Sequence, residues 1–220
     1  QGDIEGALED YTSAIAASAE SPDADYYVER AHLYAKLGRF QQTVPDLAKA
    51  CELEPCYDLN TWKCDFAASG YRLPTEAEWA YVARQEGGEV SRRYPWAGGF
   101  PPGTVVANLG DESARTILPR VIPGYNDTFP VTSPVGSFPA NPAGLYDIGG
   151  NVSEWCHDYY DAYTGRLAQE VDPLGPSTGT HRVIRGASWR DATLAETRLS
   201  YRAYQKEARD NVGFRIARYP

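Results

Sequence analysis

Residues 87–140 are the part of this chain that most restricts what it can fold into. They contain many turn residues and little helical or strand periodicity, yet Tyr94 and Phe138 are large apolar side chains that favour burial. A loop segment of this length inside a compact domain is usually functional, or is held by something other than regular secondary structure. We therefore predict long ordered loops, in which Asn108 and Asp127 are candidate oxygen donors to a cation. Asx-turns would explain these two residues equally well.

Residues 144–155, with the sequence GLYDIGGNVSEW, form a second distinctive segment. Asp147 and Glu154 place carboxylates on either side of a turn that contains two glycines. Calcium in proteins binds six to eight oxygens and mixes carboxylates with backbone carbonyls, so the pattern is compatible with a calcium loop. Taken alone, the pattern is better explained by a solvated turn whose carboxylates cap nearby backbone amides.

Composition argues against several classes of function. The formal net charge of −9 disfavours a nucleic-acid-binding surface, which would need clustered lysine and arginine. No apolar run approaches the length of a membrane span. The four cysteines contain no CxxC pair, so a structural zinc site is not expected. The chain begins with Gln1 and contains no methionine, and we therefore expect it to be a processed or excised piece.

Residues 1–55 are predicted to be helical, and their pattern repeats. Tyr11 and Ala14 of one segment are matched by Leu47 and Ala50 of the next. The pattern resembles the tetratricopeptide repeat, a helix-turn-helix unit of about 34 residues. Such repeats need about three neighbours to bury their faces, so this segment should end a longer array or pack on the rest of the chain. The resemblance implies a protein or peptide partner that binds through these helices.

The rest of the chain contains one clear helix signal and two strand signals. A helix is expected over residues 76–84, because Thr75 and Glu78 form a capping box at its start. Residues 182–189 are rich in β-branched side chains, and residues 212–216 alternate between apolar and other residues. Both patterns are typical of strands.

Five segments resemble, in the same order, motifs of the formylglycine-generating enzyme (sulfatase-modifying factor) family: GYRLPTEAEWAYVAR, YPWAGG, VGSFPANPAGLYDIGGNVSEW, RVIRGASW and NVGFRIAR. The similarity covers residues 56–220, and the change in composition near Pro55 marks its beginning. It implies an α+β, C-type-lectin-like fold with small sheets, long loops and structural calcium. A full family domain carries more chain before the first of these motifs, so this domain is expected to be partial.

The family resemblance also implies the calcium ligands, which come from side chains and backbone carbonyls. The first site would use two neighbouring pairs of residues, namely Asn108, Leu109, Asp127 and Phe129. The second site would use the glycine-containing turn described above, with the ligands Asp147, Gly150, Val152 and Glu154. In both sites the calcium would be a structural cofactor that holds the loops.

Copper chemistry is not expected. In the enzymes of this family that oxidise a sulfatase cysteine, two cysteines after a GGS[YW] turn bind copper through soft thiolate ligands. Here that turn reads GASW, the corresponding positions are Asp191 and Glu196, and no cysteine follows Cys156. Carboxylates are hard donors and do not replace a bis-thiolate copper site. Copper-dependent formylglycine formation is therefore not expected.

Other members of the family act as binding modules whose loops form the recognition face. Here that face would be residues 186–202, which we call the C-terminal loop, and its candidate contact residues are Ser188, Trp189, Asp191 and Arg198. For Trp189, core packing is the favoured interpretation over a place on this face. Arg198 and Arg215 could also pair with buried carboxylates. The sequence therefore favours a calcium-stabilised module that binds a small ligand or polypeptide, with a divergent oxidoreductase or protein-modifying enzyme of the same family as the alternative.

Overall fold

The computed structural model describes residues 3–37, 39–53, 57–58, 63–64, 71–84, 92–162 and 172–218. The chain divides into two compact units, one made of Gln1–Arg72 with Ile216–Pro220 and the other of Leu73–Arg215. Separate clusters of buried apolar side chains form their cores. None of the described helices is both long enough and apolar enough to cross a membrane.

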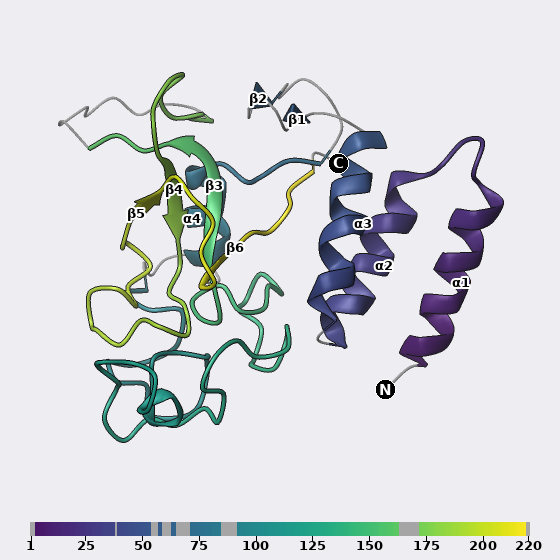
Figure 1. Ribbon diagram of the computed structural model, residues 1–220. Coiled ribbons are helices and arrows are strands. Elements are labelled where there is room, and N and C mark those ends of the chain that lie inside the picture. Colours follow the sequence, from purple (N-terminus) through teal and green to yellow (C-terminus); the bar gives the residue numbers. More distant parts are fainter. Residues whose placement is uncertain are drawn as a thin grey trace. The chain divides into compact units, whose positions relative to one another are not determined.

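The first unit contains three helices that run alternately up and down (Figure 1): α1 (Ile4–Ala17), α2 (Ala24–Lys36) and α3 (Phe40–Leu53). A short antiparallel ladder joins β1 (Tyr57–Asp58) to β2 (Lys63–Cys64). The helical prediction for residues 1–55 is confirmed over the described residues. The assignment of these helices to the tetratricopeptide family stays a prediction.

Small buried side chains let the helices of the first unit approach closely; they include Ala24, Val28, Ala31 and Ala50. Arg30 of α2 also forms a two-point ion pair with Asp46 of α3, with distances of 2.8 and 2.7 Å. The last described residues belong to this unit, because Ala217 and Arg72 exchange backbone hydrogen bonds of 2.8 and 3.0 Å.

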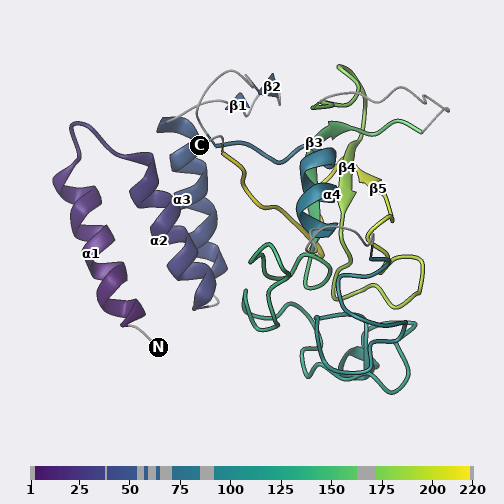
Figure 2. The same cartoon turned by 180° about the vertical axis from the view of Figure 1, so that it is seen from behind.

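The second unit contains the helix α4 (Glu76–Arg84) and a four-stranded sheet of order β5-β4-β3-β6. The strands are β3 (Ser153–Tyr159), β4 (Arg182–Arg185), β5 (Ala203–Gln205) and β6 (Val212–Gly213). β3 pairs with β4 in the antiparallel direction and with β6 in the parallel direction. Figure 2 shows α4 in front of β3 and β4. This combination of one helix, a small sheet and long loops agrees with the α+β class that the sequence predicts.

The predicted start of α4 is confirmed in detail. The Thr75 amide donates to the Glu78 carboxylate at 2.8 Å, and the Glu78 amide donates to the Thr75 hydroxyl at 3.1 Å. The strand expected over residues 212–216 is shorter than predicted, because only Val212 and Gly213 pair with β3. The residues after them leave the sheet, and Arg215 turns towards Glu154 instead.

Two apolar cores hold the second unit. The first lies between α4 and the sheet and is centred on Trp79, which is fully buried. Burying a side chain of this size stabilises the fold by roughly 4–6 kcal/mol before entropy is counted. The second core lies among the loops and contains Tyr94, Trp96, Leu109, Ile122 and Tyr125. The loop prediction for residues 87–140 is confirmed over residues 92–140, where the only regular helix or strand is the 3-10 turn Glu112–Ala114.

Candidate functional site

The structure brings the two halves of the first predicted calcium site together. Both oxygens of the Asp127 carboxylate accept backbone amides at 2.8 Å, one from Leu109 and the other from Phe129. The Asn108 side chain is fully buried and donates from Nδ2 to the Val131 carbonyl at 2.7 Å. The segments that contain the four predicted ligands therefore meet.

Several oxygens at this first site are left without a hydrogen-bond donor. Asn108 Oδ1 is buried and has no hydrogen-bond partner among the described residues. The carbonyl oxygens of Leu109 and Phe129 accept no hydrogen bond from the described residues either, and Leu109 is fully buried. Leaving a buried acceptor unsatisfied costs about 1–3 kcal/mol. A hard cation that binds carbonyl and amide oxygens would satisfy them, so the donor set fits calcium.

Burial governs the protonation of Asp127. Desolvation raises the pKa of its carboxyl to about 6, and the two amides that it accepts oppose this rise only in part. The nearby Asp111 carboxylate raises the pKa of Asp127 further, and it accepts a hydrogen bond from the Asp127 amide. The two carboxylates repel each other in a buried setting, and a divalent cation would relieve that repulsion.

The second predicted site is arranged differently. The Glu154 carboxylate is buried and already accepts hydrogen bonds from Arg215 Nε and Trp79 Nε1, each at 2.6 Å. Asp147 accepts the Gly136 amide at 2.8 Å, and burial raises the pKa of its carboxyl. A cation bound here would share the Glu154 oxygens with a guanidinium and an indole. The predicted pairing of Arg215 with a buried carboxylate is confirmed.

The remaining ligands predicted for this second site are backbone carbonyls of the turn. The Gly150 carbonyl accepts the Val152 amide at 2.9 Å. Gly150 itself packs so closely that an added Cβ would lie 2.8 Å from the carbonyl oxygen of Asn108. The segments that contain the two predicted sites therefore touch each other, and the Asn151 amide also donates to the Asn108 carbonyl at 2.8 Å. Among the described residues no cluster of three or more His, Cys, Asp or Glu side chains could hold a metal, so either site would depend on amide and carbonyl oxygens.

Two of the four contact residues predicted on the C-terminal loop are buried, so they cannot form a recognition face. Ser188 is fully buried, and Trp189 is 5% exposed and packs in the interior. The Asp191 carboxylate accepts both the amide and the hydroxyl of Ser188, each at 2.7 Å. Arg198 is half-buried, and its Nε has no partner among the described residues. Ser188 and Trp189 support the loop from inside, which leaves Asp191 and Arg198 as the predicted residues that reach the surface.

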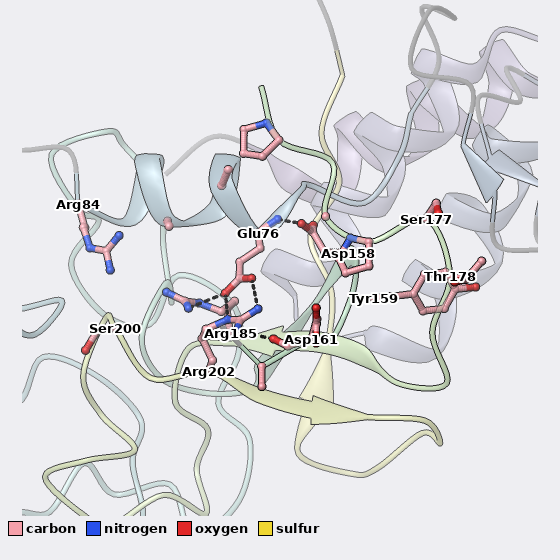
Figure 3. Close-up of a pocket in the computed structure, with 16 residues that line it drawn as sticks. Glu76, Arg84, Asp158, Tyr159, Asp161, Ser177, Thr178, Arg185, Ser200 and Arg202 are labelled. Carbon is pink, nitrogen blue, oxygen red and sulfur yellow. Dashed lines mark hydrogen bonds and ion pairs between the residues drawn. The ribbon is translucent and has the colours of Figure 1, made fainter. Parts of the chain in front are cut away.

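A pocket of about 900 Å³ lies next to α4, and its lining includes Ser200 and Arg202 from the end of the C-terminal loop (Figure 3). Its floor is a buried charge cluster in which Glu76 accepts hydrogen bonds from Arg185 at 2.8 Å and from Arg202 at 2.5 and 2.7 Å. The Glu76 amide donates to the Asp158 carboxylate at 2.6 Å. Burial raises the pKa of Asp158 to about 6. We call Glu76, Arg185 and Arg202 the Glu76 cluster.

The sequence predictions missed this pocket. Glu76 was expected only as the first residue of a helix, and Arg202 only as the last residue of the C-terminal loop. The partners are 109 and 126 residues apart in the chain, and no local pattern links them. The one available signal was the arginine directly before the GASW turn, because an arginine inside a β-branched strand needs a buried anion.

The match to known proteins decides the family. A profile of the sulfatase-modifying factor enzyme 1-like domain matches residues 8–220. The chain belongs to the sulfatase-modifying factor family.

Individual relatives agree with this assignment. The chain is 37% identical over 156 residues to the formylglycine-generating enzyme of Streptomyces coelicolor. This alignment covers 68% of this chain and 47% of that protein. It is 35% identical over 162 residues to the inactive C-alpha-formylglycine-generating enzyme 2 of Bos taurus, covering 67% and 44% of the two chains. The solved structure of Treponema denticola variable protein 1 matches with a TM-score of 0.56 and 29% identity, over 76% of this chain and 55% of that one. The chain thus spans about half the length of the curated relatives it matches.

Asp191 and Glu196 are the positions at which the family resemblance predicts copper-binding cysteines, and both are carboxylates here. Glu196 accepts the Thr193 amide at 3.1 Å, so it caps a turn. Burial raises the pKa of Asp191, and the Glu196 charge adds to that rise. Burial also raises the pKa of Tyr201, with further contributions from both carboxylates, so the tyrosine lies near the pair. Cys156 is a free thiol and is fully buried.

Proposed function

We propose that this chain is a calcium-stabilised module of the sulfatase-modifying factor family that binds a ligand or a protein, and that it does not catalyse copper-dependent cysteine oxidation. The observation that carries the proposal is the buried Asn108 Oδ1, which has no hydrogen-bond partner among the described residues and belongs to the segment that the Asp127 carboxylate binds through the Leu109 amide. The carboxylates at Asp191 and Glu196, where the family's oxidising enzymes carry cysteines, support the second half of it. The relative named as an inactive enzyme supports the idea that the family fold is used without this chemistry.

Calcium would have a structural role. Asn108 Oδ1, the carbonyls of Leu109 and Phe129 and the Asp127 carboxylate would hold the ion at the first site. When bound, the ion would cross-link two loops that otherwise meet through backbone hydrogen bonds to Asp127. The turn that contains Asp147, Gly150, Val152 and Glu154 would hold a second ion, with Arg215 sharing the Glu154 oxygens.

The exposed part of the C-terminal loop fits a polypeptide partner. Leu194 and Tyr201 are 42% and 38% exposed; Leu194 lies between Asp191 and Glu196 in the sequence, and Tyr201 lies near both carboxylates. Exposed apolar side chains close to half-buried carboxylates suit a polypeptide segment that carries both apolar and basic residues. In the first unit, a groove of about 420 Å³ among the helices is lined by Leu8, Thr12 and Tyr34 among others, and it supports a second partner surface.

A calcium titration tests the proposal. Saturation at about 100 times the dissociation constant would add about 2.7 kcal/mol of stability. For a chain of this size the melting temperature would rise by roughly 5–10 °C. Asp127→Asn should abolish most of the rise, whereas Asp172→Asn, at an exposed position with φ of 48°, should keep it. Because burial raises the pKa of Asp127 to about 6, calcium affinity should fall as the pH drops below 6.

The same measurement defines failure. If calcium and a chelator give the same melting temperature for the unsubstituted protein, the calcium part of the proposal is wrong. If calcium stabilises Asp127→Asn as strongly as the unsubstituted protein, the ion binds elsewhere.

The second candidate is a divergent oxidoreductase or protein-modifying enzyme of the same family. The observation that favours it is the group formed by Asp191, Glu196 and Tyr201, because acidic groups with raised pKa values often mark reactive sites. Oxygen consumption with cysteine-containing peptides, measured with added iron, manganese or copper, tests it. Turnover that is lost in Asp191→Asn and kept in Asp172→Asn would favour this candidate over the binding module.

A further inference from the structure

The pocket beside α4 has an uneven distribution of charge. Arg84 lies at one end with Ser200, while Asp158 and Asp161 lie on the far side of the Glu76 cluster (Figure 3). Among the described residues, Arg84 has no carboxylate within ion-pair distance. It donates one long hydrogen bond, of 3.4 Å, to the Leu199 carbonyl. Within the part of the chain that the structure describes, no carboxylate therefore compensates the positive charge at the Arg84 end of the pocket.

The neighbouring arginine increases this excess. Arg185 Nη2 donates to the same Leu199 carbonyl at 2.6 Å, so two guanidinium groups converge on one neutral acceptor. Burial lowers the pKa of Arg185, and the Arg84 charge lowers it further. Glu76 cannot compensate both, because Arg202 also binds its two oxygens. An anion at this end would relieve the repulsion between the arginines.

The rest of the pocket indicates which kind of anion would fit. Ala77 and Ala80 of α4, together with Pro173 and Pro176, line the pocket and provide apolar surface for an organic body. At about 900 Å³ the pocket is in the size range of small-molecule sites. One unpaired guanidinium balances one negative charge, and its fork of N–H donors matches a carboxylate.

We propose that this pocket binds the carboxylate of an organic monocarboxylic acid, with Arg84 as its ion-pair partner and the apolar face of α4 against its body. The acid is either a free small molecule or the C-terminal carboxylate of an extended peptide. In the peptide case, the hydroxyls of Ser177 and Thr178 at the other end of the pocket are placed to accept or donate hydrogen bonds to backbone amides. The site does not depend on calcium, so it stands or falls separately from the proposed function.

Three probes test the proposal on the full chain: hexanoate, acetyl-trialanine with a free carboxylate, and the same peptide as its C-terminal amide. Binding is followed by NMR through the Arg Nε–H signals and by isothermal titration calorimetry. We expect the Arg84 signal to shift with at least one of the two acids, and the amide to bind at least about tenfold more weakly than its acid. Binding of hexanoate alone identifies a free acid, and binding of the peptide acid alone identifies a chain terminus.

Substitutions provide the control. Arg84→Gln should lower the affinity for the bound acid about tenfold, whereas Arg120→Gln, which removes the same charge from an exposed position elsewhere, should leave it unchanged. If Arg84→Gln does not fold, the shift of the Arg84 signal in the unsubstituted protein decides the matter. Equal binding of acid and amide, an Arg84 signal that does not move with either acid, or equal affinities of the two variants would overturn the proposal.

Discussion

Removing the Arg215 side chain should destabilise the second unit far more than removing an exposed arginine. Arg215 donates to both oxygens of Glu154, and the two side chains are 21% and 6% exposed. It also donates to the Tyr146 carbonyl at 3.2 Å. In Arg215→Met the methionine fills most of the space, but Glu154 is left as a buried charge with Trp79 as its remaining hydrogen-bond donor.

The expected magnitude comes from this geometry. Breaking one partner of a buried ion pair costs about 3–5 kcal/mol, and the partial exposure of Arg215 places it near the lower end, at about 3 kcal/mol. For a chain of this size that loss corresponds to a melting temperature about 6–12 °C lower. The matched control is Arg115→Met, whose ion pair with Glu112 lies on the surface with Arg115 63% exposed. Such a pair contributes at most about 1 kcal/mol.

The assay is urea unfolding followed by tryptophan fluorescence, supported by calorimetry. A double variant, Arg215→Met with Glu154→Gln, should recover part of the loss, because it removes the stranded charge. Equal unfolding free energies for Arg215→Met and Arg115→Met would refute the reasoning, since Glu154 would then have access to water. A double variant less stable than Arg215→Met would also contradict it.

Three further perturbations probe the same unit. Trp79→Phe should cost about 2–3 kcal/mol in urea unfolding, because it removes apolar volume and the 2.6 Å hydrogen bond to Glu154; an unchanged midpoint would contradict the contact. Burial raises the folded-state pKa of Asp158 to about 6, above its ordinary value, so the folded protein binds this proton more tightly than the unfolded chain. The free energy of unfolding should therefore fall by about 1–1.5 kcal/mol as the pH rises from 5 to 7.5. Asp158→Asn should remove this fall from the stability–pH curve. Gly150→Ala should lower the melting temperature and weaken calcium binding together, because its Cβ would lie 2.8 Å from Asn108, and normal calcium binding in this variant would argue against coupling of the two loops.

The buried arginine–carboxylate pairs explain how a unit with little regular structure is held together. Glu154 connects Arg215 to Trp79, and Glu76 connects Arg185 to Arg202. Each carboxylate accepts from two different segments, and in both cases one partner lies in the C-terminal part of the unit. Such pairs fix geometry more than they add stability, because removing charges from water offsets much of their attraction. These pairs connect the segments of the second unit directly, through side chains of the protein itself.

Local sequence determined the features that depend on neighbouring residues. The helix at 76–84 was predictable because a capping box satisfies the first amides of a helix by contacts three residues apart. The ordered loops of residues 92–140 were predictable because aromatic residues without periodicity must still be buried. The family was evident from five motifs in one order, which the profile match over residues 8–220 confirms.

Only the tertiary structure decided which side chains meet. Glu76 reads as an exposed helix residue in the sequence, yet folding places it between Arg185 and Arg202, more than a hundred residues away. Ser188 reads as a loop surface, but its hydrogen bonds to Asp191 turn it inwards, and for Trp189 the structure shows the core packing that the sequence already favoured. The unsatisfied oxygen of Asn108 was equally invisible, because an amide in a loop shows its missing partner only once its surroundings are packed. Periodicity and capping are short-range effects, whereas burial and charge pairing depend on segments that the chain brings together from a distance.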